Sequence, residues 1–144
     1  MILFWSRSEQ GAGLSNFAPV RIDIRIYNRP FRFKSAEAAY QAHKVGVETI
    51  PLFQGMSAYE AKQNIKHYAI RTDWADWKDR AMRRVLDVKF SKPKYRDILL
   101  ETGDEELVHW APWDQYWGWS EHRGGENKLG NMLMEIRSLL EKEE

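Results

Sequence analysis

A run of strict alternation near the N-terminus constrains the fold of this chain more than any other feature. In residues 20–27, branched apolar residues alternate with charged or aromatic ones. That period is typical of a strand with one buried face. Residues 28–30 supply turn formers, and residues 31–33 are expected to return as a second strand. The sequence therefore predicts a β-hairpin.

The rest of the chain is predicted to be mostly helical. Ser35 is a suitable N-cap for a helix that ends near Gly46, and Ser57 with Glu60 fits a capping box. Helices are expected at about 36–46, 58–67, 73–90, 93–103 and 127–140, and short strands at 2–5 and 107–110. We expect one compact α+β domain over residues 1–144, with a small sheet that includes the hairpin.

Composition argues against several classes of function. The 144 residues include no cysteine, which removes disulfides, thiolate zinc sites and cysteine nucleophiles. The four histidines lack metal-ligand spacing, and the sequence contains no phosphate-binding loop, dinucleotide fingerprint, HExxH pair or Gly-x-Ser-x-Gly elbow. No metal or cofactor is therefore expected. Because there is neither a long apolar run nor a signal-peptide pattern, we expect a cytoplasmic protein.

Charge and tryptophan content leave a nucleotide-like ligand open. The net charge of +1 gives no global attraction to polyanions, although nucleic acid could still bind locally. The chain has seven tryptophans, whose flat faces suit aromatic ligands. Trp74 and Trp77 recur at helical spacing and are predicted to lie in the core.

Residues 35–44, SAEAAYQAHK, gather reactive side chains on one predicted helix face. At about 100° per residue, Glu37, Gln41 and Lys44 fall within about 60° of one another, with Tyr40 beside them. Such a face is either solvated or reactive, and spacing does not decide between the two.

A second group of residues lies near the C-terminus. An aromatic loop at 113–119 precedes Gly124 and Gly125, which lead into the last predicted helix. Backbone N–H groups at a helix start can hold phosphate, and Asn127 could add an amide; an ordinary loop is the alternative. Together with the polar face, these parts suit a ligand with a ring, a sugar and a phosphate.

Glu37 and Lys44 have suitable chemistry for cleaving a bond at a sugar's anomeric carbon. A carboxylate can stabilise the positive charge that develops on the sugar ring, or deprotonate the attacking water. A lysine could hold the carboxylate ionised, donate to a hydroxyl, or attack an opened sugar as a Schiff base. The sequence leaves these roles open.

An ordered series of motifs resembles the YbiA-like, or NADAR (NAD- and ADP-ribose-associated), family of N-glycosidases. The series covers nearly the whole chain, and the order of its members makes it specific. It comprises LSNF at 14–17, SAEAAYQAHK at 35–44, Met82 followed by Lys89-Phe90, LLETG at 99–103, Asp114 with Trp117-Gly118, GENKLG at 125–130 and LMEIR at 133–137.

The resemblance implies a YbiA-like α+β fold and hydrolysis of N-glycosidic bonds in ribosylated compounds. It implies two substrate classes, ADP-ribose attached to guanine in nucleic acid and ribosylamino-pyrimidine phosphates early in riboflavin synthesis. Glu37 and Lys44 match the family's acidic residue and helix lysine, so they are the implied catalytic residues. The implied substrate-binding residues are Asn16, Phe17, Tyr40, Gln41, Asp114, Trp117, Gly118 and Asn127.

The sequence departs from the family pattern at two places. His109 stands where many members have an acidic residue, and Trp119-Ser120 alters a WGxG loop. These departures motivate an alternative function, a module that binds ADP-ribose or NAD derivatives without cleaving them. A third interpretation is a structural or partner-binding domain whose tryptophans all lie in the core. Oligomeric state stays open.

Overall fold

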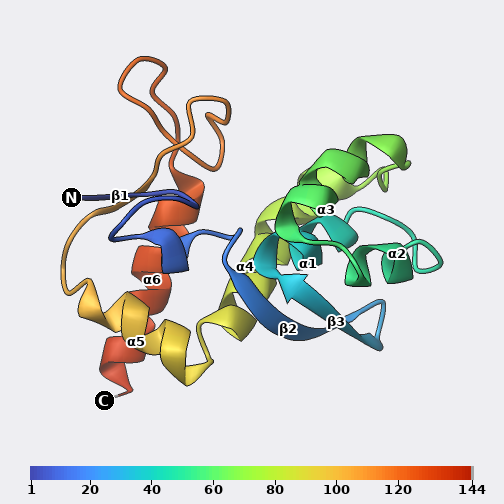
Figure 1. Ribbon diagram of the computed structural model, residues 1–144, viewed down its shortest axis with the longest axis horizontal. Helices are drawn as coiled ribbons and strands as arrows, with labels where there is room; N and C mark the ends of the chain where they lie inside the picture. Colours follow the sequence, from blue (N-terminus) through green and yellow to red (C-terminus); the bar gives the residue numbers. More distant parts are fainter. Residues whose placement is uncertain (144) are drawn as a thin grey trace. The chain divides into compact units, whose positions relative to one another are not determined.

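The predicted hairpin is present in the structure, a computed structural model that describes residues 1–143. Strand β2 (Pro19–Ile26) pairs antiparallel with β3 (Arg29–Ser35), as Figure 1 shows in blue and cyan. The isoleucines of β2 are buried and its charged side chains are exposed. The alternation in the sequence therefore separates a core face from an outer face.

The predicted position of the hairpin turn, residues 28–30, is wrong. The turn consists of Tyr27 and Asn28, whose φ angles are 51° and 62°. Positive φ at both central residues gives a tight turn whose twist matches that of the flanking strands. Pro30 therefore belongs to β3, where it lies opposite Arg25.

The hairpin belongs to a compact unit, Asn16–Lys89, that is centred on helix α1 (Ala36–Ala42). Helix α1 lies against both strands and against the other α-helices of this unit. These elements are α2 (Ile50–Gln54), α3 (Ala58–Asn64) with the short 3₁₀ helix η2 (Ile65–His67), and α4 (Trp74–Lys89). Because neighbours surround α1, all seven of its residues are buried.

The core of this unit consists of the inner face of the hairpin and the small residues of α1. Ile22 and Phe33 from the two strands are at most 1% exposed, and the alanines of α1 are fully buried between the strands and the helices. Burying an isoleucine or phenylalanine side chain contributes about 1.5–3 kcal/mol. Alanine lets the neighbouring elements approach α1 closely.

The second compact unit is formed by residues 1–15 and 90–143. Strand β1 (Ile2–Phe4) pairs parallel with β4 (Leu107–His109), and helix α6 (Lys128–Lys142) lies against β4 and α5 (Pro93–Glu101). A short 3₁₀ helix, η1 (Ala12–Leu14), contacts α5. The strands thus form two separate two-stranded sheets in place of the one small sheet that was expected.

The α+β fold class and most predicted elements are confirmed, with three corrections. Helix α1 ends at Ala42, before Gly46, because the backbone tightens to bonds between residues three apart, such as Lys44 N–H to Gln41 O at 3.0 Å. Helix α2 was not expected, since five residues are too few for a helical period. Trp74 and Trp77 are only partly buried, so their assignment to the core is wrong. In the part of the chain that the structure describes, no helix could cross a bilayer.

Candidate active site

The start of helix α1 fixes Glu37 in position. The Ser35 hydroxyl accepts a hydrogen bond from the Ala38 N–H at 3.1 Å, as expected of an N-cap, and the Glu37 N–H donates to the Asn16 carbonyl at 3.0 Å. The exposed fractions of Glu37, Tyr40 and Gln41 are 8%, 5% and 5%. The alternative of a solvated face is therefore wrong, and these polar groups are held inside the unit.

Glu37 and Gln41 are hydrogen-bonded side chain to side chain. The Gln41 Nε2 group donates to Glu37 Oε2 at 2.5 Å, one helical turn away. This orients the Gln41 amide, because a carboxylate only accepts and the NH₂ group only donates. Gln41 Oε1 is buried without a hydrogen-bond donor.

Asn16 has a second buried acceptor of this kind. Its Nδ2 group lies 3.3 Å from the Met82 sulfur, and its Oδ1 atom has no hydrogen-bond donor. A buried polar atom left unsatisfied costs about 1–3 kcal/mol. Asn16 and Gln41 each contact Glu37 directly, the first through its backbone and the second through its side chain. Two residues that meet Glu37 thus each carry a buried acceptor that a bound donor would satisfy.

Lys44 lies against two aromatic rings. Its Nζ atom is 5.3 Å from the ring centroid of Tyr40 and 5.7 Å from that of Trp74, and the two rings are 5.4 Å apart. Ring faces attract an ammonium group. Trp74 was missed as a candidate because helical spacing suggested the core, yet it is the first residue of α4 and is only partly buried.

Phe17 follows Asn16 and lies close to another cation. The Lys62 Nζ atom of α3 is 5.6 Å from the Phe17 ring centroid. All six predicted site residues of the unit Asn16–Lys89 therefore lie on or next to α1. Three are on the helix, Lys44 follows it, and Asn16 and Phe17 belong to the segment that is hydrogen-bonded to its first turn.

A buried histidine, His43, supports the end of α1. Its Nδ1 atom is 2.7 Å from the Ala39 carbonyl, and its Nε2 atom is 2.8 Å from Arg84 Nη1. Since a guanidinium only donates, Nε2 accepts and the proton resides on Nδ1. Burial lowers the pKa of His43 from 6.5 to about 4, and the positive charges of Arg84 and Arg71 act in the same direction. No spacing in the sequence singles out this residue.

In the other unit, Asp114 shapes the aromatic loop. Its Oδ1 atom accepts from the backbone N–H groups of Tyr116 and Trp117, both at 3.0 Å, an Asx-turn that fixes the path of the loop. The Trp117 ring is partly exposed and meets the Tyr116 ring edge-on, with centroids 5.0 Å apart.

The glycines of this loop allow close backbone packing. A Cβ atom on Gly118 would lie 2.6 Å from the Ala111 Cβ, and one on Gly125 would lie 2.2 Å from the Gly118 carbonyl oxygen. Asn127 connects the loop to β4, because its side chain accepts from the His109 N–H at 2.9 Å and donates to the Leu107 carbonyl at 3.0 Å. Both ends of the Asn127 amide therefore hold the start of α6 against the strand.

The two departures from the family pattern have structural roles. The His109 ring stacks on Phe4 with centroids 5.2 Å apart, as part of the packing between β4 and β1. Ser120 is 2% exposed, and its hydroxyl accepts from the Arg123 N–H at 3.3 Å. Both residues are accommodated by the packing of their own unit.

The predicted site residues thus form two groups. Asn16–Lys89 brings together Glu37, Gln41, Asn16, Phe17, Tyr40 and Lys44, to which the structure adds Trp74. The other unit brings together Asp114, Trp117, Gly118 and Asn127 before α6. Among residues 1–143, no three His, Asp or Glu side chains lie together as metal ligands would.

Comparison with known proteins gives consistent matches over nearly the whole chain. A family model described as the NADAR domain matches residues 3–141. The N-glycosidase YbiA of Escherichia coli is 30% identical over 97% of this chain and 88% of its own length. An N-glycosidase of Nostoc punctiforme is 34% identical over 85% of this chain and 81% of its own length.

Two further matches concern a plant protein and a solved structure. The chloroplastic riboflavin biosynthesis protein PYRR of Zea mays is 30% identical over 96% of this chain, which spans 25% of that protein. The NMR structure of Escherichia coli YbiA matches with a TM-score of 0.82 and 30% identity, covering 99% of this chain and 85% of that one.

Proposed function

This chain belongs to the NADAR domain family, and we propose that it is a hydrolase that cleaves the N-glycosidic bond of a ribosylated compound. The observation that carries the proposal is the buried Glu37 carboxylate together with Gln41 Oε1 and Asn16 Oδ1. Buried acceptors without donors, on two residues that contact the residue with the buried carboxylate, suit a ligand rich in hydroxyl groups.

Each of these groups has a distinct role in the proposed reaction. The hydroxyls of ribose are donors, so they satisfy the two acceptors and place the sugar against Glu37. As the bond to the base breaks, positive charge develops on the ring, and the carboxylate stabilises it or takes a proton from the attacking water. Gln41 holds the carboxylate in one orientation through its 2.5 Å hydrogen bond.

Lys44 is the second proposed catalytic residue. Its ammonium lies against Tyr40 and Trp74, where it can stabilise negative charge on the substrate or, once neutral, form a Schiff base with an opened sugar. Borohydride treatment during turnover distinguishes these roles, because it traps a substrate adduct on Lys44 only in the covalent case.

The decisive variant is Glu37→Gln, which keeps the shape of the side chain and removes its charge. We expect kcat/KM to fall about 10²–10⁴-fold, the usual contribution of a positioned acid or base. Glu48→Gln, which removes an exposed carboxylate of the same unit, is the matched control and should keep full activity. A folded Glu37→Gln variant with undiminished activity would refute the proposed role of Glu37.

We propose two substrate classes, which product analysis by mass spectrometry separates. The PYRR relative supports a ribosylamino-pyrimidine phosphate, whose cleavage releases ribose 5-phosphate. Cleavage of ADP-ribosyl-guanine in an oligonucleotide would instead release ADP-ribose. Saturable ADP-ribose binding without cleavage of either compound would identify the alternative, a binding module. The predicted substrate contacts of Asp114, Trp117, Gly118 and Asn127 are part of this proposal.

A further inference from the structure

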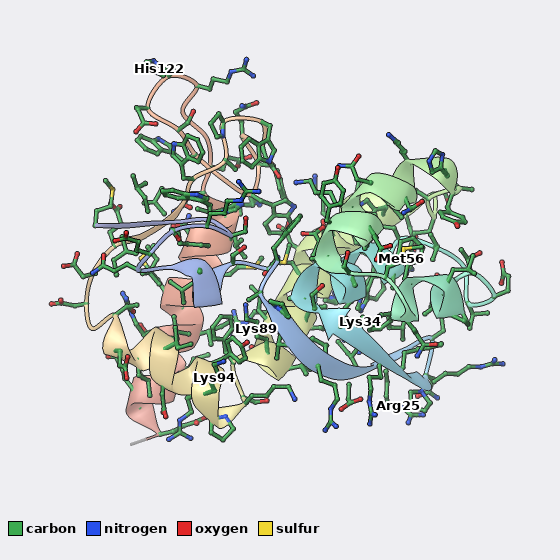
Figure 2. The ribbon with its side chains drawn as sticks, viewed as in Figure 1. Arg25, Lys34, Met56, Lys89, Lys94 and His122 are labelled. Atoms are coloured by element: carbon green, nitrogen blue, oxygen red, sulfur yellow. The ribbon has the colours of Figure 1, made fainter. Side chains whose placement is uncertain are left out.

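The hairpin concentrates positive charge on its outer face. Residues 19–35 contain a single acidic side chain, Asp23, although the chain as a whole has a net charge of only +1. The cationic side chains of the same segment are all exposed, and they are Arg21, Arg25, Arg29, Arg32 and Lys34. Figure 2 labels Arg25 and Lys34 on the hairpin. The positive charge is therefore concentrated on the hairpin, although the net charge of the whole chain does not reveal it.

Beside this face, where the hairpin meets α2 and α4, lies a groove of about 720 Å³, here called the hairpin groove. The two strands contribute Arg25, Arg32 and the half-buried Phe31, and α4 contributes Arg84 and Val88. Guanidinium groups from three elements thus border an apolar floor that includes an aromatic ring.

Two of the groove arginines are already engaged within the protein. Arg84 donates through Nη1 to His43 and through Nη2 to the Arg25 carbonyl, and Arg25 Nη2 donates to the Asn28 carbonyl.

Arg32 in the groove and Arg21 beside it keep hydrogen-bonding capacity for a ligand. Arg21 and Arg32 both contact Asp23 through Nε, at 3.0 Å and 2.8 Å, which leaves their Nη groups for another acceptor. These ion pairs are exposed, so they add little to stability and can be exchanged for a phosphate at small cost. A guanidinium is also the side chain best suited to bidentate contacts with phosphate.

We propose that the hairpin groove and the exposed face around it bind the backbone of a single-stranded nucleic acid. On β3, Arg32 and Lys34 are two residues and about 7 Å apart, so these two cations can meet successive phosphates. Arg21 and Arg25 on β2 are four residues apart, about twice that distance. Phe31 offers a ring on which a base can stack, as in other single-strand sites. A bilayer surface fits less well, because a flat surface does not reach the floor of a groove.

This binding does not depend on the proposed hydrolysis. The residues that line the groove lie on β2, β3, α2 and α4, the cations around it lie on the hairpin, and Glu37 is not among them. Loss of nucleic-acid binding would leave the glycosidase proposal intact, and the reverse also holds.

The test is the salt dependence of binding to a fluorescein-labelled oligothymidylate, followed by anisotropy between about 50 and 200 mM salt. The double variant Arg25→Gln, Arg32→Gln removes two phosphate contacts. The slope of log K against log salt should therefore become shallower by about 1.4, at about 0.7 per contact for a single strand. Lys94→Gln, Arg96→Gln on α5 removes the same charge from exposed positions of the other unit and should keep the wild-type slope.

A third variant separates stacking from charge. Phe31→Leu keeps an apolar floor, so it should weaken binding several-fold without changing the slope. The proposal is overturned if wild-type protein does not bind the oligonucleotide at low salt, or if both double variants change the slope equally. It is also overturned if phosphatidylserine vesicles or polyglutamate bind as tightly as the oligonucleotide, with the same response to the hairpin variant.

Discussion

Acidification should destabilise this protein through His43, and the size of the effect follows from its surroundings. The ring is 5% exposed, and Arg84 Nη1 occupies the position where a second ring proton would point. Burial lowers the pKa of His43 in the folded state from 6.5 to about 4. The unfolded chain therefore binds a proton near pH 6.5 that the folded protein takes up only near pH 4.

The sign follows from this difference in proton binding. Stability falls as the pH is lowered from about 6.5 to about 4, because only the unfolded state gains the proton. A lowering of the pKa from 6.5 to about 4 corresponds to about 3 kcal/mol of unfolding free energy. Above pH 6.5 the contribution of His43 to stability is fully present.

Urea unfolding at a series of pH values measures this loss, and His43→Gln isolates it. The glutamine does not titrate, so the variant should lack about 3 kcal/mol of the pH dependence that wild type shows between pH 6.5 and 4. His67→Gln is the control, because it removes an exposed imidazole and leaves His43 in place. Equal pH dependence in wild type and His43→Gln would refute the reasoning.

Three further predictions concern stability. Lys89 is fully buried, and burial lowers its pKa from 10.5 to about 7. The free energy of unfolding should therefore fall by about 5 kcal/mol as the pH drops from 10.5 to 7. Lys89→Met should abolish this pH dependence, as measured by urea unfolding. Gly125→Ala should cost more in thermal unfolding than Gly103→Ala: both glycines have positive φ, but only at Gly125 would the added methyl lie 2.2 Å from the Gly118 carbonyl oxygen. Ser57→Ala should cost about 1 kcal/mol, because it removes the N-cap acceptor of α3, and a change below a few tenths would contradict this.

Local patterns in the sequence predicted the elements that carry strong local signals. Ser35 caps α1, Ser57 and Glu60 form a capping box, and the alternating residues of β2 form a strand with one buried face. The hairpin turn was predicted too far toward the C-terminus, because it begins at Tyr27 and a tyrosine gives no strong sequence signal for a positive φ angle. The resemblance to a family supplied the expected reaction and the choice of Glu37 and Lys44 as catalytic candidates.

Burial, by contrast, was decided by tertiary packing. A helical period assigns one face to the core, but α1 is covered on every side because two strands and three α-helices pack against it. Only that packing brings Glu37, Gln41 and Asn16 into one buried cluster with two unsatisfied oxygens. It also gives His43 its partner Arg84, which lies 41 residues away in the sequence.

The hairpin depends both on its local sequence and on tertiary packing. The sequence by itself determined that residues 20–26 form a strand with isoleucines on one face and charges on the other, because side chains along a strand point alternately to opposite sides. Only the tertiary structure decided that the charged face borders a groove with Arg84 and Phe31, because such contacts depend on how α4 and β3 pack around the strand.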